Sequence, residues 1–255
     1  MEAFELSIMT MTLLLLAALI AGFIDTLVGG GGLITLPALM VAGVPPMFAL
    51  GTNKLQSAVG TGTASLSMFR RQKVRFEHVN TMMATAFIGS LLGSTIVQFF
   101  DAKVLNVVIP LVIGVIAVYF VLAPTQALTE RAPSISKSKY TTTAVPAIGF
   151  YDGMFGPGTG SFFVLAGVTL QGQHIVNATV VAKTLNFATN FAALLIFIWF
   201  GKVLWAVGGL MMLGQYVGAS LGARALLKIN PIYLRCLVIG VCFLILSTWG
   251  INNYA

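Results

Sequence analysis

Charged residues are scarce in this chain of 255 residues: Asp, Glu, Lys and Arg together make up only 8%. A soluble domain carries roughly 25%. Hydrophobic residues reach 58%, and the mean hydropathy is +0.95. This composition excludes an ordinary soluble protein and predicts an all-α polytopic membrane protein, because long apolar runs cross a bilayer as helices.

The residues that build most enzyme and metal sites are also few. The chain has two histidines without ligand spacing, and its two cysteines, Cys236 and Cys242, fall on different faces of a predicted helix. The glycine-rich segment 156–160 is not followed by Gly-Lys-Ser/Thr, so it is no nucleotide P-loop. No Ser-His-Asp or paired-carboxylate signature is present. The sequence therefore predicts neither an enzyme nor a bound metal or cofactor.

The net charge of +7 is carried by basic residues at the ends of apolar runs. In a soluble protein this charge would point to nucleic acid, but here its position reports membrane topology. The first five residues are acidic and lack the positive start of a cleaved signal peptide. We therefore expect no nucleic-acid partner, and we expect membrane lipid around a mature chain that includes its N-terminus.

Four consecutive glycines, Gly29, Gly30, Gly31 and Gly32, interrupt the first apolar region. Each Gly weakens a helix by roughly 1 kcal/mol relative to Ala, so the helix must break there. Irregular backbone at bilayer depth persists only where protein buries it or where it lines a watery cavity. The following apolar piece, 33–43, would rise about 16 Å as a helix, half of a ~30 Å hydrocarbon core. The glycines thus predict a hairpin break near mid-membrane and a binding site there.

One polar linker, residues 123–140, divides the chain into two halves, 1–122 and 141–255. The second half restates the first. Its matching landmarks are Gly149-Phe-Tyr-Asp152 for Gly22-Phe-Ile-Asp25, and Gly156-Pro157-Gly158-Thr159-Gly160 for the four glycines. Further pairs recur at one constant offset, namely Lys54 with Lys183, Lys73 with Lys202, Gly89 with Gly218 and Gly93 with Gly222. We therefore predict two transmembrane repeats, each with a Gly-broken hairpin or half-helix pair plus three long transmembrane helices.

Charge predicts that the two repeats have inverted topology. Five segments in each repeat are an odd number, which inverts the second repeat relative to the first. The loop 70–78 after the third segment is strongly basic, whereas in the second half the basic residues Arg224, Lys228 and Arg235 flank the loop after the fourth segment. Cytoplasmic loops carry the excess of Lys and Arg, so these loops and the linker 123–140 are predicted to be cytoplasmic. Both termini are then predicted to be periplasmic.

Two lysines, Lys54 and Lys183, lie inside long apolar segments. A charge at the bilayer centre costs at least ~2.5 kcal/mol, which makes it a functional-site candidate. Lys54 could instead snorkel to the interface. Snorkelling does not require the polar residues that accompany the two lysines, which are Asn53, Gln56, Ser57, Asn186 and Asn190.

Asp25 and Asp152 each precede a glycine break by about one helical turn. Such a carboxylate could bind a coupling proton or cation, or it could pair with a lysine and cap the broken helix. The sequence leaves both roles open and does not say which lysine is near.

The glycine breaks are suited to binding an anion. A helix that starts after a glycine tip directs free N–H groups and a partial positive charge at the tip. Two such helix starts, together with Lys54 and Lys183, predict a positive pocket near the midplane for one small anion. The hydroxyls of Thr35, Thr159 and Ser161, just after the breaks, would donate further hydrogen bonds. Because the second tip is not all glycine, we expect the anion to lie closer to one tip.

Glycines of another kind are Gly89, Gly93, Gly218 and Gly222, which are spaced four apart on long apolar runs. Small residues at this spacing let two membrane helices approach closely. We predict that these four glycines form packing surfaces and bind no ligand.

Several of these segments resemble one known family. The segments 21–25 and 29–39, the triplet Thr52-Asn53-Lys54 and the segment 149–157 are together similar to the sulfite exporter TauE/SafE family, also called the toluene sulfonate uptake permeases, and most to its YfcA branch. The resemblance implies a multi-pass transporter of the bacterial inner membrane. In characterised relatives the cargo is sulfite or an organosulfonate such as sulfoacetate, and the family includes both exporters and importers.

We therefore expect a secondary transporter that moves a small anion, such as sulfite, an organosulfonate or a related sulfur compound, through a site between the repeats. A proton gradient, a sodium gradient or the membrane potential would drive the transport. The sequence leaves open whether the chain forms a homo-oligomer. The alternatives are a passive anion channel, an intramembrane enzyme acting on a lipid phosphate, and a partner subunit without transport of its own. The enzyme would need clustered acidic residues and Arg at the break, which this sequence lacks.

Overall fold

The computed structural model describes residues 6–72, 79–122, 131–225 and 240, and in these ranges every regular element is a helix. The prediction of an all-α fold is confirmed. The elements in chain order are α1 (Ile8–Val28), α2 (Gly32–Val41), α3 (Pro46–Gln72), α4 (Asn80–Val97), α5 (Ala102–Leu122), α6 (Lys137–Lys139), the π-helical turn η2 (Tyr140–Ala144), α7 (Val145–Met154), α8 (Thr159–Gln171), α9 (Ile175–Trp199) and α10 (Trp205–Ala225).

Four of these helices are long and apolar enough to cross a membrane, namely α1, α4, α9 and the Ala102–Tyr119 part of α5. Large apolar side chains such as Ile8, Leu13 and Leu16 on α1 and Leu111 and Val115 on α5 are exposed on the surface of the bundle. A lipid bilayer covers such side chains at no cost, whereas water does not. The composition and the surface agree on a membrane-integral protein.

Both glycine stretches break the helix as predicted. After α1 the backbone turns through Gly29 and Gly30, which have φ angles of 79° and 98°. After α7 it turns through Gly156 and Gly158, which have φ angles of 95° and 79°. Side chains disfavour this left-handed region, so only glycine adopts it without strain. Each break is followed by a short helix, α2 with 10 residues and α8 with 13.

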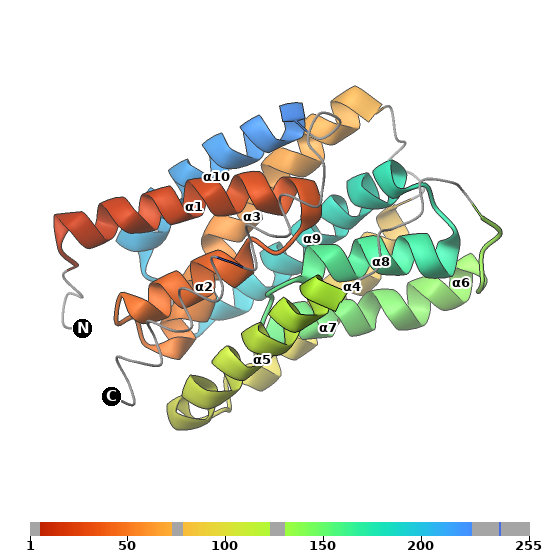
Figure 1. Cartoon of the computed structure of the whole chain (residues 1–255). Helices are drawn as coiled ribbons and strands as arrows, with labels where there is room; N and C mark the ends of the chain where they lie inside the picture. Colours follow the sequence, from red (N-terminus) through yellow and green to blue (C-terminus); the bar gives the residue numbers. More distant parts are fainter. Residues whose placement is uncertain (1–5, 73–78, 123–130, 226–239, 241–255) are drawn as a thin grey trace.

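The two hairpins meet at their glycine tips. Figure 1 shows α1 and α2 approaching from the end of the bundle where α1 begins, while α7 and α8 approach from the opposite end. A Cβ atom added to Gly29 would lie only 2.5 Å from the backbone nitrogen of Ser161. One added to Gly160 would lie 3.3 Å from the Cα atom of Gly29. The tips therefore touch through backbone, which a side chain at either glycine would prevent.

The glycines spaced four apart pack helices together, as predicted. On α4, Cβ atoms at Gly89 and Gly93 would collide with the backbone carbonyls of Pro146 and Phe150 in α7. On α10, Cβ atoms at Gly218 and Gly222 would collide with the backbone carbonyls of Leu19 and Phe23 in α1. Each tight pair joins a helix from the first half to a helix from the second half. The two halves are thus interleaved around a shared centre.

Residues 131–136 of the linker run beside the end of α8, where the N–H groups of Arg131 and Ser134 donate to the carbonyls of Gly172 and Leu170, each at 2.9 Å. The helix begins at Lys137, so the last residues of the predicted linker are already helical. Residues 123–130 lie outside the described residues. The other predictions that fall outside the described residues concern residues 1–5, Lys73 with the loop 73–78, and Lys228, Arg235, Cys236 and Cys242 with the last long run of the second half. The inverted topology of the repeats stays a prediction.

Candidate functional site

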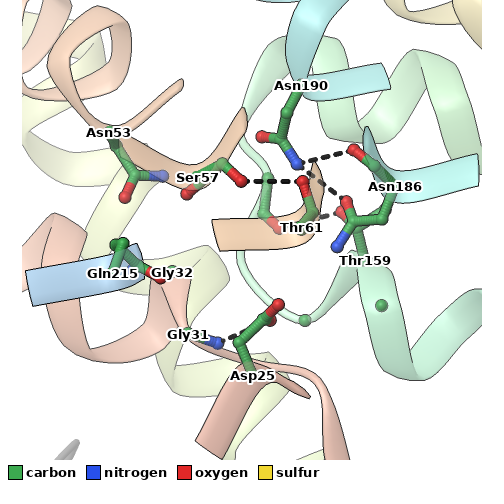
Figure 2. Close-up of a pocket in the computed structure, with 13 residues that line it drawn as sticks. Asp25, Gly31, Gly32, Asn53, Ser57, Thr61, Thr159, Asn186, Asn190 and Gln215 are labelled. Atoms are coloured by element: carbon green, nitrogen blue, oxygen red, sulfur yellow. Dashed lines mark hydrogen bonds between the residues drawn. The ribbon is translucent and has the colours of Figure 1, made fainter. Parts of the chain in front are cut away.

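A polar cavity lies where the two glycine tips meet (Figure 2). Its wall combines both tips with residues of α1, α3, α9 and α10. The lining residues are Asp25, Gly31, Gly32, Asn53, Ser57, Thr61, Gly156, Gly158, Thr159, Gly160, Asn186, Asn190 and Gln215. Every side chain in this wall is polar, although the chain as a whole is strongly apolar.

Helical spacing places the polar side chains of α3 and α9 on the cavity. Asn53, Ser57 and Thr61 are four residues apart on α3, and Asn186 and Asn190 are four apart on α9. Residues at this spacing lie on one face of a helix. Because α3 and α9 pack against each other, these two polar faces oppose one another across the same space.

Hydrogen bonds fix the orientation of two side-chain amides in the wall. The oxygen Oδ1 of Asn53 accepts from the Thr35 hydroxyl at 2.6 Å and from the Gln56 amide at 2.7 Å. The oxygen Oδ1 of Asn186 accepts from Asn190 Nδ2 at 2.9 Å. With their oxygens engaged inside the protein, Asn53 and Asn186 each keep an NH₂ group as a donor for the cavity.

Other donors of the wall are unused. Among the described residues, the Ser57 hydroxyl and the backbone N–H groups of Gly32 and Gly160 have no hydrogen-bond partner. The two N–H groups belong to the first turns of α2 and α8, where no carbonyl of the same helix can reach them. We call this site the donor-lined cavity, defined by the donors of Asn53, Ser57, Asn186, Gly32 and Gly160.

Asp25, which lines the cavity, forms an ion pair with Lys183. Lys183 Nζ lies 3.0 Å from Asp25 Oδ2, and the Gly31 N–H donates to Asp25 Oδ1 at 3.0 Å. The Lys183 side chain is fully buried, whereas the Asp25 side chain is 15% exposed. Asp25 thus caps the start of α2 and balances Lys183, and each of its oxygens already has a donor.

A second ion pair, between Lys54 and Asp152, is sealed inside the protein. Lys54 Nζ lies 2.8 Å from Asp152 Oδ1 and also donates to the backbone carbonyl of Asp152. The Thr159 hydroxyl donates to the same carboxylate oxygen at 2.9 Å. Within the described residues the other oxygen, Asp152 Oδ2, has no donor. This pair ties α3 to the end of α7 and to the start of α8.

The two pairs are crossed, because each lysine binds the aspartate of the other half. Of the two roles that the sequence leaves open for the aspartates, pairing with lysine and capping are therefore present in the structure. Neither lysine lines the cavity, so the positive wall expected from Lys54 and Lys183 is not formed here; both charges are balanced behind it.

Most predicted site residues do line the cavity: Asp25, Gly31, Gly32, Asn53, Ser57, Gly156, Gly158, Thr159, Gly160, Asn186 and Asn190. Others lie behind its wall, namely Gly29, Gly30, Thr35, Lys54, Gln56, Asp152, Ser161 and Lys183. Two of these have their hydroxyls engaged: that of Thr35 with Asn53, and that of Ser161 with the carbonyl of Val28.

Thr61 and Gln215 line the cavity without having been predicted. Thr61 could have been predicted from the sequence, because it lies on the same helix face as Asn53 and Ser57. It is also separated from Asn190 by the same number of residues as Lys54 from Lys183. Gln215 is a polar residue in an apolar run and has no polar counterpart at that offset. Only the packing of α10 against α1 and α3 places it here.

The family comparison agrees with the motifs at this site: the family model described as "Sulfite exporter TauE/SafE" matches residues 14–248. This chain belongs to the sulfite exporter TauE/SafE family. The match extends over both glycine tips and both lysines of this family member, and it confirms the resemblance carried by those motifs.

Three relatives of this TauE/SafE protein carry transporter names. "Probable membrane transporter protein ORF9" of Sinorhizobium sp is 45% identical over 220 residues, which are 86% of this chain and 84% of the relative. "Probable membrane transporter protein YfcA" of Escherichia coli K12 is 41% identical over 243 residues, 94% of this chain and 90% of the relative. A "Probable membrane transporter protein" of Haemophilus influenzae is 38% identical over 240 residues, 94% of each chain. No solved structure matches the chain significantly.

Proposed function

We propose that this TauE/SafE protein is a secondary transporter that binds one small anion in the donor-lined cavity. The observation that carries the proposal is the set of unused donors: three side chains and two backbone N–H groups converge on one space and lack protein partners among the described residues. Buried donors without partners are costly, so a ligand that accepts hydrogen bonds binds there favourably.

The charge balance around the cavity also favours an anion. The one carboxylate among its lining residues, Asp25, is paired with Lys183 through one oxygen and with the Gly31 N–H through the other, so its negative charge is already balanced and repels an anion less than a free carboxylate would. Two helix starts meet at the same place, and each adds the partial positive charge of a helix N-terminus.

The class of anion follows from chemistry and from the family name. A sulfite or sulfonate group presents three oxygens that accept hydrogen bonds, which suits donors arriving from α2, α3, α8 and α9. The family is named for sulfite export. We therefore propose sulfite, an organosulfonate or a related sulfur compound as the cargo, and the inner membrane of a bacterium as the location.

The test is a thermal-shift screen of the purified protein against sulfite, sulfate, thiosulfate and methanesulfonate. A ligand that binds only the folded state raises the melting temperature in proportion to RT ln(1 + [L]/Kd), about 2.7 kcal/mol at a hundredfold excess over Kd. We expect at least one of these anions to stabilise the protein and chloride at the same ionic strength not to do so. The proposal would be contradicted if chloride stabilised the protein as much as these anions do, or if none of these anions stabilised it.

A further inference from the structure

Of the two crossed ion pairs, only the Asp25–Lys183 pair has a carboxylate that lines the cavity. The Asp25 side chain is 15% exposed and lines the cavity, whereas that of Asp152 is 2% exposed and does not. Water and a proton therefore reach Asp25 through the cavity. The Lys54–Asp152 pair is held by Thr159 and a backbone carbonyl as well, which fits a fixed structural link.

The missing side chain of Gly160 lets the Lys183 ammonium lie close to the cavity. A Cβ atom on Gly160 would lie 3.0 Å from Lys183 Nζ and 3.3 Å from Asn186 Nδ2. Gly160 and Asn186 both line the cavity. Only a glycine backbone therefore stands between the Lys183 ammonium and the donors of the cavity.

Lys183 is the charged side chain that meets Asp25 among the described residues. The N–H of Gly31, at the start of α2, donates a hydrogen bond to Asp25. The groups that three other helices present to the cavity are neutral: Asn53, Ser57 and Thr61 on α3, Thr159 and Gly160 on α8, and Gln215 on α10. The empty site is therefore balanced, with one negative and one positive charge. Adding an anion alone would leave one uncompensated negative charge away from water, which is strongly unfavourable.

We propose that the anion enters together with a proton and replaces Asp25 as the partner of Lys183. A proton from water binds the Asp25 carboxylate, which becomes a neutral carboxylic acid, and Lys183 keeps its positive charge. The bound anion then balances Lys183, so a singly charged anion leaves the net charge of the site unchanged. This inference rests on the proposed function and deepens it: the preferred cargo is a monoanion, such as a sulfonate or hydrogen sulfite, and the coupling ion is a proton.

The test measures anion affinity against pH with methanesulfonate, a monoanion that does not itself titrate near neutral pH. If one proton is taken up with each anion, the apparent Kd of the wild type rises with pH, toward roughly tenfold for each pH unit. In Asp25→Asn the side chain is always neutral, so we expect binding that does not vary with pH. The control is the double variant Lys54→Met with Asp152→Leu, which removes the other ion pair without leaving a buried charge unpaired, and in it we expect the pH dependence of the wild type.

The Asp25→Asn change leaves Lys183 unpaired and could prevent folding, so a double variant accompanies it. Asp25→Asn with Lys183→Gln removes both charges together, and we expect it to fold and to lose methanesulfonate binding. Binding in the double variant equal to the wild type, or an Asp25→Asn variant that keeps the wild-type pH dependence, would overturn the inference. Sulfate bound more tightly than methanesulfonate would overturn the preference for a monoanion. If no anion binds the wild type at all, the proposed function itself fails.

Discussion

Lys54 and Lys183, the two buried lysines among the described residues, each have one carboxylate partner, contributed by the other half of the chain. The two lysines stand out in the sequence because a charge within an apolar segment is costly, and the two aspartates stand out because they precede the breaks. Pairing of these four residues was one of two open roles. Which lysine meets which aspartate depends on contacts between residues far apart in the chain, and no local pattern encodes it.

The buried Lys54–Asp152 ion pair leads to a prediction about the stability of the protein. Replacing Asp152 by Asn leaves the Lys54 ammonium buried without its partner, which costs about 3–5 kcal/mol in a protein interior. We expect Asp152→Asn to lower the melting temperature strongly, and Lys54→Met with Asp152→Leu to lower it less, because the double variant buries no unpaired charge. Thermal unfolding of the three proteins in detergent measures this. A double variant less stable than the single one would contradict the account.

The position of the Ser57 hydroxyl leads to a prediction about anion binding. It faces the cavity and has no protein partner among the described residues, so Ser57→Ala should leave stability almost unchanged. A hydrogen bond to a charged ligand contributes about 1.5–3 kcal/mol, so anion affinity should fall roughly tenfold or more. The matched control is Ser65→Ala on the same helix, since Ser65 is bonded to Thr184 at 2.9 Å and does not line the cavity. That control should lower stability and keep the affinity; the reverse result would exclude Ser57 from the site.

At the scale of the helices, the boundaries are well predicted from sequence. The predicted apolar piece 33–43 corresponds to α2 (Gly32–Val41), and the glycines before it form the predicted break. These features are local, because glycine weakens a helix wherever it stands and an apolar run of given length fixes the span. The partner of each helix is not local. Gln215 reaches the cavity only because α10 packs against both α1 and α3, and the sequence of α10 alone does not predict these contacts.

The glycines of α10 allow a direct test of helix packing. In Gly218→Ala the new Cβ atom would meet the carbonyl oxygen of Leu19 in α1, so the two helices must move apart. In Gly209→Ala on the same helix the Cβ atom would meet nothing within 4 Å. We expect Gly218→Ala to lower the melting temperature and Gly209→Ala to raise it slightly, since Ala favours a helix by up to about 1 kcal/mol over Gly. Equal effects of the two changes would rule out close packing at Gly218.

At the scale of the whole molecule, both halves of the chain build one site. Helix α1 packs on α10 and α4 packs on α7, so each tight pair joins the two halves, and the two hairpin tips meet between them. Such interleaving around a shared cavity is typical of transporters built from repeats, in which the two repeats move around a fixed site. The repeats at 1–122 and 141–255 are predicted from sequence because their landmarks recur at nearly constant spacing.

The predicted opposite orientation of the two repeats also predicts on which side of the membrane the termini lie. The basic loop after the third segment of the first repeat, and the basic residues around the fourth loop of the second, should all face the cytoplasm. Both termini then lie in the periplasm. A green fluorescent protein fused to the C-terminus, which fluoresces only in the cytoplasm, should stay dark, while a periplasmic phosphatase fused at the same place should be active. A bright fusion would show that the predicted orientation is wrong.

Transport of a small sulfur anion through the donor-lined cavity is the function that we propose for this protein. The most direct measurement is counterflow in proteoliposomes loaded with unlabelled sulfite or methanesulfonate and diluted into labelled anion. A carrier exchanges the two, so we predict a transient accumulation of label in wild-type vesicles and a weaker one with Ser57→Ala. Label that only equilibrates, without overshoot, would indicate a passive channel, and no uptake above protein-free vesicles would contradict transport of these anions.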